Sequence, residues 1–285
     1  MIIARITGGL GNQLFQYAAG LALAERLGSE LKLDLSFYKN HGLRTVELDQ
    51  FNTRITEASE EECAPFVQQH LLKRVFYRLV PPYRRPVYKQ PGFGYDPFFE
   101  KAKDGKYLKG YWQSWKFFQP IEEQIRRQYQ LKPASTEHLR EMADTFRTEK
   151  TISVHIRRGD YKNPEALAYH GILSPSYYNQ ALKRMQQLHP DAQVLFFSDD
   201  MDWVLQNIQT EMPHRFITNI ITRNAIEDFY LMQNCQHHII ANSSFSWWAA
   251  WLNPSAEKTV IAPQSWFAYG GNETRDILPP SWIRI

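Results

Sequence analysis

The sequence predicts an α/β fold with parallel sheets, arranged as two lobes with a cleft between them. Short β-branched runs alternate with helical patterns, and a glycine-rich turn joins the first such run to the first helical pattern. Proline and glycine also gather in the middle of the chain, where a domain boundary can fall. Alternating strands and helices form parallel sheets, because each helix carries the chain back to the edge where the strand began. The 285 residues suffice for two domains of ordinary size.

The N-terminal residues predict the first strand–helix–strand unit. The β-branched run at residues 2–6 predicts a strand, and apolar residues at helical spacing after Leu14 predict a helix that stops at Gly28. The alternation of polar and apolar residues at 30–35 predicts a second strand that runs parallel to the first.

The second half of the chain repeats this pattern more densely. Ser174 before Pro175 is typical of a helix start, because serine caps the first turn and proline fits the first helical position. Strands are expected at residues 151–156, 194–197, 215–218, 238–241 and 259–262, and helices at residues 175–188, 200–208, 225–235 and 245–251. Trp247, Trp248 and Trp251 recur at helical spacing, which favours a place in the core.

The middle of the chain, residues 50–150, gives weaker patterns that prolines and glycines break into short pieces. A mixed-charge helix is expected at residues 138–146, just before the second sheet. We therefore predict one lobe at residues 1–140 and another at residues 141–285. Clefts between such lobes are common ligand sites, so we expect the ligand there.

Composition and charge disfavour several classes of protein. A net charge of +3 and a pI of 8.7 give only a weak attraction to nucleic acid. Cys63 and Cys235 cannot build a disulfide framework in a chain of this length, which favours a reducing compartment.

Arg5 interrupts the N-terminal apolar run, and no apolar stretch is long enough to span a membrane, so we expect a cytoplasmic protein. The basic segment at residues 71–89 could contact an anionic membrane surface, although a solvated helix and a proline-rich loop are the simpler interpretation.

Polar residues follow three of the predicted strands in the second lobe. They are Arg-Arg-Gly-Asp at 157–160, Ser-Asp-Asp at 198–200 and Asn-Ser-Ser at 242–244. In open parallel sheets, ligands bind beyond the carboxyl ends of the strands. Guanidinium groups and the amides of a helix N-terminus both bind phosphate, so these segments predict a phosphate site. The alternative is structural, with an ion pair inside the first segment and a simple helix cap in the third.

Four segments of the chain carry recognisable motifs. They are Gly-Gly-Leu-Gly-Asn-Gln-Leu-Phe-Gln-Tyr at 8–17, Tyr-Trp-Gln-Ser-Trp at 111–115, His-Ile-Arg-Arg-Gly-Asp-Tyr at 155–161 and Asn-Ser-Ser-Phe-Ser-Trp-Trp at 242–248. Together they closely resemble the α-1,2-fucosyltransferases of glycosyltransferase family 11. The resemblance covers almost the whole chain and is weakest between the first two segments.

This resemblance implies an inverting transfer of L-fucose from GDP-fucose to the 2-hydroxyl of a terminal galactoside. It also implies two Rossmann-like lobes of the GT-B type, with the acceptor on the N-terminal lobe, the donor on the C-terminal lobe, and no metal or other cofactor. In this family's wider group the residue matching Arg157 binds the β-phosphate and the residue matching Asp228 binds the guanine. The implied donor site comprises Gly9, Gly11, Asn12, Gln13, His155, Arg157, Arg158, Asp160, Asp228, Ser243, Ser244 and Phe245.

An inverting transfer also needs a general base near the attacking hydroxyl. Glu165 matches, by its spacing after the second motif, the proposed basic glutamate of the α-1,6-fucosyltransferases, and we rank it ahead of Asp34 at the end of the second strand. Two alternatives stay open. Asp200-Met201-Asp202 spells the D-x-D pattern that holds a metal in other glycosyltransferases, although acidic residues are also favoured at a helix start. The chain could also bind a nucleotide or a glycan without catalysis.

Overall fold

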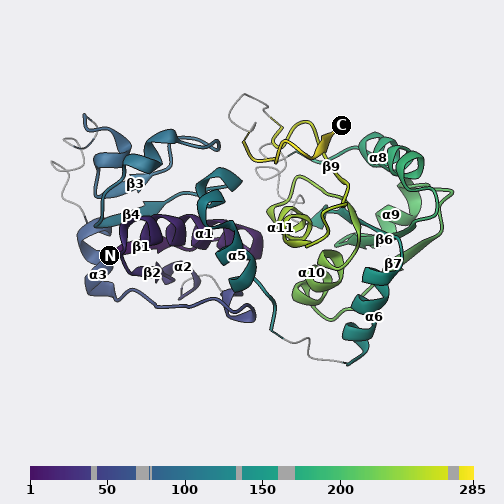
Figure 1. Cartoon of the computed structure of the whole chain (residues 1–285), viewed down its shortest axis with the longest axis horizontal. Coiled ribbons are helices and arrows are strands. Elements are labelled where there is room, and N and C mark those ends of the chain that lie inside the picture. The colour runs from purple at the N-terminus through teal and green to yellow at the C-terminus, as the bar shows by residue number, and fades with distance from the viewer. Residues whose placement is uncertain (40–43, 69–76, 78, 133–136, 160–170, 269–275) are drawn as a thin grey trace. The chain divides into compact units, whose positions relative to one another are not determined.

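The computed structural model describes the chain except for residues 40–43, 69–76, 78, 133–136, 160–170 and 269–275 (Figure 1). The chain divides into two units, Met1–Gln130 with Arg275–Ile277, and Leu131–Thr274 with Leu278–Ile285. Each unit is built on its own parallel sheet. The fold is therefore of the α/β class that the alternation of strands and helices predicts.

The first unit contains a four-stranded sheet in the order β2-β1-β4-β3, and all of its pairs are parallel. The strands are β1 (Ile2–Arg5), β2 (Leu31–Asp34), β3 (Val87–Lys89) and β4 (Lys106–Lys109). The first two confirm the strands expected at residues 2–6 and 30–35. The other two come from the middle of the chain, where the sequence patterns are weak.

Helix α1 (Leu10–Leu27) packs on one face of this sheet. The approach is close at Gly20, where a Cβ atom would lie 2.9 Å from the Cβ of Ala4. The helix ends as expected at Gly28, which has a φ of 58° and donates its amide to the carbonyl of Glu25. On the opposite face, Ile3 packs with Cys63 of helix α3 (Glu60–Val67).

Short helices and turns fill the rest of the first unit. They are α2 (Ser36–Lys39), η1 (Leu48–Gln50), η2 (Pro82–Arg84), η3 (Pro97–Lys101), η4 (Trp115–Phe117), η5 (Gln119–Ile121) and α5 (Glu122–Gln128). An aromatic cluster consolidates this part of the chain, with Trp112 in contact with Tyr88, Phe99 and Phe117 at ring-centroid distances of 5.2–5.5 Å. Of the basic segment at residues 71–89, residues 71–76 and 78 lie outside the described residues.

The second unit contains a six-stranded parallel sheet in the order β10-β9-β8-β5-β6-β7. Its strands are β5 (Thr151–Ile156), β6 (Gln193–Ser198), β7 (His214–Ile217), β8 (His237–Ile239), β9 (Val260–Ala262) and β10 (Ile283–Arg284). Its helices are α6 (Glu137–Thr148), α8 (Pro175–Leu188), α9 (Met201–Asn207), α10 (Ala225–Gln233) and α11 (Ser244–Leu252). All five strands predicted for this half are confirmed, and β10 is added at the C-terminus.

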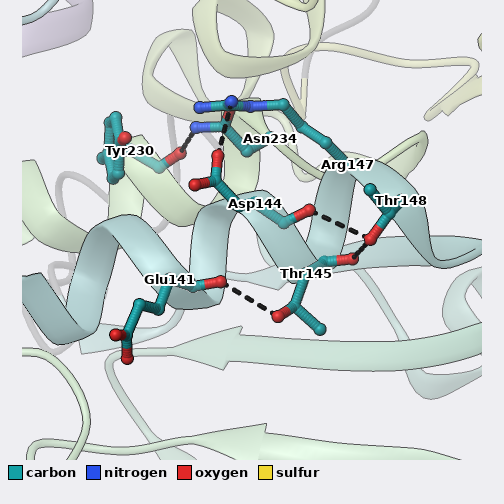
Figure 2. A network of polar contacts seen from close by, with 7 residues as sticks. All are labelled: Glu141, Asp144, Thr145, Arg147, Thr148, Tyr230 and Asn234. Carbon is teal, nitrogen blue, oxygen red and sulfur yellow. Dashed lines mark hydrogen bonds and ion pairs between the residues drawn. The ribbon is translucent and has the colours of Figure 1, made fainter.

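Polar contacts join helix α6 to the end of helix α10 (Figure 2). The Arg147 guanidinium donates from Nε to Asn234 Oδ1 at 2.6 Å and from Nη1 to Asp144 Oδ1 at 2.7 Å. Asn234 in turn donates from Nδ2 to the carbonyl of Tyr230 at 2.6 Å. These contacts place α6 in the second unit, so the division falls between Gln130 and Leu131, ahead of the boundary predicted at residue 140.

Helix α11 lies in the core of the second unit. Trp247 and Trp248 are fully buried and Trp251 is 6% exposed, which confirms the expected core position of all three. Their rings contact one another at centroid distances of 5.0–6.0 Å. This packing fixes the start of the helix, at Ser243 and Ser244, next to the sheet. Among the helices in the described part of the chain, none is long and apolar enough to cross a membrane.

Candidate functional site

Three strand ends of the second sheet meet at one edge. Strands β8, β5 and β6 are neighbours and parallel, so the segments after them emerge side by side. Hydrogen bonds join these segments: Arg157 Nη1 donates to Ser243 Oγ at 3.2 Å, and the Arg158 amide donates to Asp199 Oδ1 at 2.7 Å. The structure thus brings together the polar segments that the sequence predicts to converge.

Arg157 and the start of helix α11 form the cationic part of this edge. Ser243 is the N-cap residue of α11, yet its side chain makes no capping hydrogen bond within the helix and accepts from Arg157 instead. Amides in the first turn of a helix lack partners within the helix and carry the positive end of its dipole. A guanidinium beside such a helix start is suited to bind a phosphate group.

Arg158 has a different position from its neighbour. Its guanidinium carbon lies 3.9 Å from the ring centroid of Trp203, and its Nε is 3.4 Å from Asp200 Oδ2. These contacts hold the side chain against helix α9, where it packs and balances charge. Of the two arginines in the motif, Arg157 is therefore the better placed for a phosphate.

Among the described residues, Asp199, Asp200 and Asp202 are the aspartates that follow strand β6 at this edge. Asp199 accepts the amides of Arg158 and Gly159 at 2.7 and 2.8 Å. Asp200 caps helix α9 by accepting the amide of Trp203 at 3.2 Å, and Asp202 lies in the first turn of that helix. The capping interpretation of the D-x-D pattern is confirmed for Asp200. In the described ranges, no three His, Cys, Asp or Glu side chains are grouped as a metal site would require.

His155 and Phe245 form a buried wall beside Arg157. The rings of His155 and Phe245 are 5.6 Å apart, and Phe245 also contacts Phe229 of helix α10 at 5.4 Å. Burial, with a smaller contribution from the Arg157 charge, lowers the pKa of His155 to about 3, so the imidazole is neutral. Its buried Nδ1 makes no hydrogen bond within the described chain, which leaves one polar atom at this wall for a ligand.

Asp228 of helix α10 has a strongly raised pKa. Burial raises the pKa to about 6, a hydrogen bond from Thr222 Oγ1 at 2.7 Å offsets part of this rise, and Glu227 adds to it. A carboxylate that is costly to ionise gains more from further hydrogen-bond donors than an exposed one does. Thr222 was not identified from the sequence, because nothing in the residues before the helix marks it as a partner of Asp228.

The residues predicted for the donor site in the N-terminal motif lie in the first unit. Gln13 is fully buried and holds a loop, since it donates to the carbonyl of Thr45 at 2.9 Å and accepts the amide of Glu47 at 2.9 Å. Asn12 Oδ1 accepts from Gln113 at 2.7 Å. Gly9 is the N-cap residue of α1, and Gly11 lies in its first turn. The contacts of Gln13 are those of a structural side chain.

Of the two candidates for the general base, Asp34 lies in the described part of the chain and Glu165 does not. Glu165, like the donor-site candidate Asp160, lies outside the described residues. Asp34 is 4% exposed and accepts hydrogen bonds from the Tyr107 hydroxyl and the Ser36 amide. Burial acts to raise the pKa of Asp34, but these hydrogen bonds, with a smaller effect of Arg5, outweigh it and hold the pKa below its usual value. A buried and already paired carboxylate is a poor proton acceptor, so the geometry argues against Asp34 as the base.

Comparisons with known proteins agree with this geometry. Residues 94–285 match the family model described as Glycosyl transferase family 11. The chain is 32% identical to an alpha-1,2-colitosyltransferase of Escherichia coli, with 100% of this chain and 99% of that protein covered. It is 31% identical to the O-antigen biosynthesis glycosyltransferase WbnK of Escherichia coli, over 98% and 99% of the two chains. It is 27% identical to the galactoside alpha-(1,2)-fucosyltransferase 1 of Mus musculus, over 86% of this chain and 61% of that protein.

Solved structures with a similar fold include the fucosyltransferase NodZ from Bradyrhizobium, with a TM-score of 0.50, 14% identity, and 87% and 91% of the two chains covered. A variant of Arabidopsis thaliana FUT1 has a TM-score of 0.50 and 12% identity, over 91% of this chain and 69% of that one. At such identities the likeness concerns the fold, which is of the GT-B type.

Proposed function

Because the chain belongs to glycosyltransferase family 11, we propose that it transfers L-fucose from GDP-fucose to the 2-hydroxyl of a terminal galactoside, with inversion at the anomeric carbon. One observation carries the proposal: Arg157 is held by Ser243 at the start of helix α11, on the sheet edge where neighbouring parallel strands end. That is where a nucleotide diphosphate binds in open parallel sheets.

The departing diphosphate is the group that this edge would stabilise. In the transfer, the acceptor oxygen forms a bond to the anomeric carbon while the bond from that carbon to the β-phosphate oxygen breaks. Negative charge then grows on the leaving GDP. Arg157 and the first-turn amides of α11 supply fixed positive potential there, and one such preorganised donor contributes about 3 kcal/mol to a rate.

The guanine base is assigned to Asp228. Its carboxylate would accept from the N1 and N2 hydrogens of guanine, a pair of donors that neither uracil nor cytosine presents. The raised pKa of Asp228 supports this role, because two added donors would compensate the burial that opposes its ionisation. Phe245 and His155 would form the wall between the base and the phosphates, with His155 Nδ1 as the polar atom on it.

Metal independence is part of the proposal. The positive charge that a metal would bring to the diphosphate is supplied by Arg157 and the helix start. Of the two carboxylates of the D-x-D pattern, Asp200 already accepts the amide of Trp203, and Asp202 lies in the first turn of helix α9, where an acidic residue is favoured. For the proton of the acceptor hydroxyl, Glu165 stays the proposed base, since the contacts of Asp34 occupy its carboxylate.

GDP-colitose is a second candidate donor. The relative that matches the whole chain at 32% identity is a colitosyltransferase with the same α-1,2 linkage in its name. Colitose is fucose without its 3-hydroxyl group, so the same diphosphate and guanine contacts serve either sugar nucleotide. The choice between the two donors therefore depends on contacts to a single hydroxyl group.

The test is a transfer assay in EDTA with GDP-fucose, GDP-colitose and UDP-galactose, a galactose-terminated acceptor, and product analysis by NMR. We expect GDP release and a fucosyl group on the galactose 2-hydroxyl. Higher kcat/KM with GDP-colitose would replace fucose by colitose as the sugar. Activity that requires Mn²⁺ would favour a metal-dependent transferase, and tight GDP binding with no turnover of any donor would favour a binding protein.

A further inference from the structure

A pocket of about 390 Å³ lies at the carboxyl edge of the first sheet. Its lining begins where three adjacent strands end, at Arg5 of β1, Lys89 of β3 and Lys109 of β4. From β1 the chain passes to β2 on one side, whereas β4 and β3 lie on the other side. The order of the strands therefore changes direction between β1 and β4, and such a point is where open α/β sheets bind ligands.

Two aromatic residues, Phe93 and Tyr111, line this pocket. Tyr111 is 44% exposed, whereas the next residue, Trp112, is buried and packs in the aromatic cluster of the first unit. An exposed aromatic ring at the wall of a pocket supplies a flat apolar surface, and the carbon–hydrogen face of a sugar ring packs against surfaces of this kind.

The backbone beside Tyr111 is held in a costly conformation. Trp112 has a φ of 55°, which residues with a side chain rarely adopt. Gln90 Oε1 accepts the amides of Tyr111 and Trp112 at 3.1 and 2.7 Å. Gly110 makes room for this side chain, since a Cβ there would lie 2.6 Å from the Cβ of Gln90. Strained conformations persist only where the surrounding structure enforces them, and they cluster at ligand sites.

A second buried glutamine forms the polar side of the pocket. Gln16 of helix α1 donates to the carbonyl of Gly110 at 3.2 Å and to Thr7 Oγ1 at 3.1 Å, and it accepts the amide of Thr7 at 2.8 Å. Thr7 lines the pocket, and among the described residues none accepts a hydrogen bond from its hydroxyl, which leaves that hydrogen for a ligand. The walls are formed before any ligand arrives, which lowers the entropic cost of binding.

The cations at this edge do not by themselves select an anion. Arg5 pairs in register with Asp34 of β2, and the two opposite charges attract each other. Lys109 likewise interacts with other groups of the protein. The features that distinguish the pocket are therefore an exposed aromatic ring, a hydroxyl donor and preformed walls, which suit a neutral ligand that carries hydroxyl groups.

We propose that this pocket binds the galactose unit of the acceptor, with the apolar face of the sugar against Tyr111. The inference rests on the proposed transfer to a galactoside, and it adds which surface recognises galactose. The axial 4-hydroxyl of galactose points to one face of the ring and leaves the hydrogens of C3, C4 and C5 together on the other. Glucose lacks this continuous patch, because its C4 hydrogen points to the opposite face.

The test compares lactose with cellobiose, two disaccharides that differ only in the configuration at C4 of the terminal sugar. Their dissociation constants are measured by NMR titration with saturating GDP, so that the donor site is occupied. We expect lactose to bind about three- to tenfold more tightly, as a contact with one aromatic ring allows. Saturation transfer from the protein should be strongest at the hydrogens on C3, C4 and C5 of the galactose.

Three variants locate the effect. Tyr111→Ala should weaken the binding of lactose about three- to tenfold, whereas Tyr111→Phe should keep the native affinity because the ring remains. Phe98→Ala is the matched control, since Phe98 is a similarly exposed aromatic residue of the first unit, at 49%, outside the lining of the pocket. It should leave the affinity for lactose unchanged. Both positions are exposed, so all three variants should keep the native melting temperature.

Equal affinity for lactose and cellobiose would overturn the inference. So would lactose binding that survives Tyr111→Ala, that Phe98→Ala weakens to the same extent, or that GDP abolishes by competition. Transfer of fucose to lactose is measured in parallel to keep the two proposals apart. Transfer with a KM for lactose that Tyr111→Ala does not change leaves the function standing and the pocket wrong. Lactose binding that depends on Tyr111, without any transfer, leaves the pocket standing and the function wrong.

Discussion

Asp228 should make the binding of GDP depend on pH, with a midpoint near pH 6. Burial raises the pKa of this carboxyl to about 6 in the free protein. To accept two hydrogen bonds from guanine the carboxyl must be ionised, so a protonated Asp228 has to lose its proton first. As the pH falls through 6, the protonated fraction grows and the affinity falls. Relative to pH 8, the dissociation constant for GDP should be about twofold higher at pH 6 and about tenfold higher at pH 5.

Calorimetric titration between pH 5 and 8 measures this effect, with UDP as the reference ligand. The terminal phosphate of both nucleotides also titrates near pH 6, so the ratio of the two dissociation constants isolates the contribution of the base. Asp228→Asn should weaken GDP by about 1–3 kcal/mol and make the ratio independent of pH. Thr222→Val removes a hydrogen bond that lowers the pKa, and should move the midpoint above pH 6; Glu227→Gln removes a repelling charge and should move it below. A ratio that stays constant over this range in the native protein would refute the guanine role of Asp228.

Four further outcomes follow from the contacts described above. Arg157→Ala should lose about a hundredfold or more in kcat with little change in melting temperature, and near-normal turnover would transfer the phosphate role to the neighbouring arginine. The double substitution Asp200→Asn with Asp202→Asn should keep activity within about tenfold in EDTA, whereas an inactive variant, with the native enzyme rescued from EDTA by Mn²⁺, would restore the metal interpretation. Burial lowers the pKa of His237 to about 4, so between pH 6.5 and 4 the unfolded chain binds a proton at this residue and the folded chain does not. His237 should therefore contribute a fall of about 1 kcal/mol per pH unit to the free energy of unfolding over this range, and urea titrations should show a slope shallower by that amount in His237→Gln. Asp34→Asn should cost about 1–3 kcal/mol of stability and leave the acidic limb of the pH–rate profile in place; loss of that limb at unchanged stability would make Asp34 the base after all.

The second sheet could be predicted from the sequence because each strand there is a local pattern. Strand β5 was expected at residues 151–156 and is found at Thr151–Ile156, all six residues of it buried. Helix α8 begins at Pro175 after the Ser174 cap and ends at Leu188, as the cap and the periodicity indicate. Strand β5 alternates polar residues with Ile152, Val154 and Ile156, and this period of two is the pattern that a search by periodicity detects.

The partners of the charged site residues could not be predicted in the same way, because they lie far away in the sequence. Asp34 is paired with Tyr107, 73 positions later, and the Arg157 guanidinium with Ser243, 86 positions later. A sequence pattern shows that Asp34 follows a strand, but it does not show that a hydroxyl from another strand occupies its carboxylate. Whether a carboxylate is a base or a structural acceptor depends on that contact, which only the three-dimensional register supplies.

Charged residues stand at different positions in the two parallel sheets, and this difference explains why those of the first sheet are harder to recognise from the sequence. In the second sheet the apolar strand ends first, and the motif residues such as Arg157 follow it. In the first sheet the charge stands on the last residue of the strand itself, as at Lys89 and Lys109. A three-residue strand that ends in lysine retains only two residues of strand pattern, so a search by periodicity does not detect it. The charges Asp34, Arg5, Lys109 and Lys89 are recognised as one row only once the register joins residues from four separate segments of the chain, which no sequence motif does.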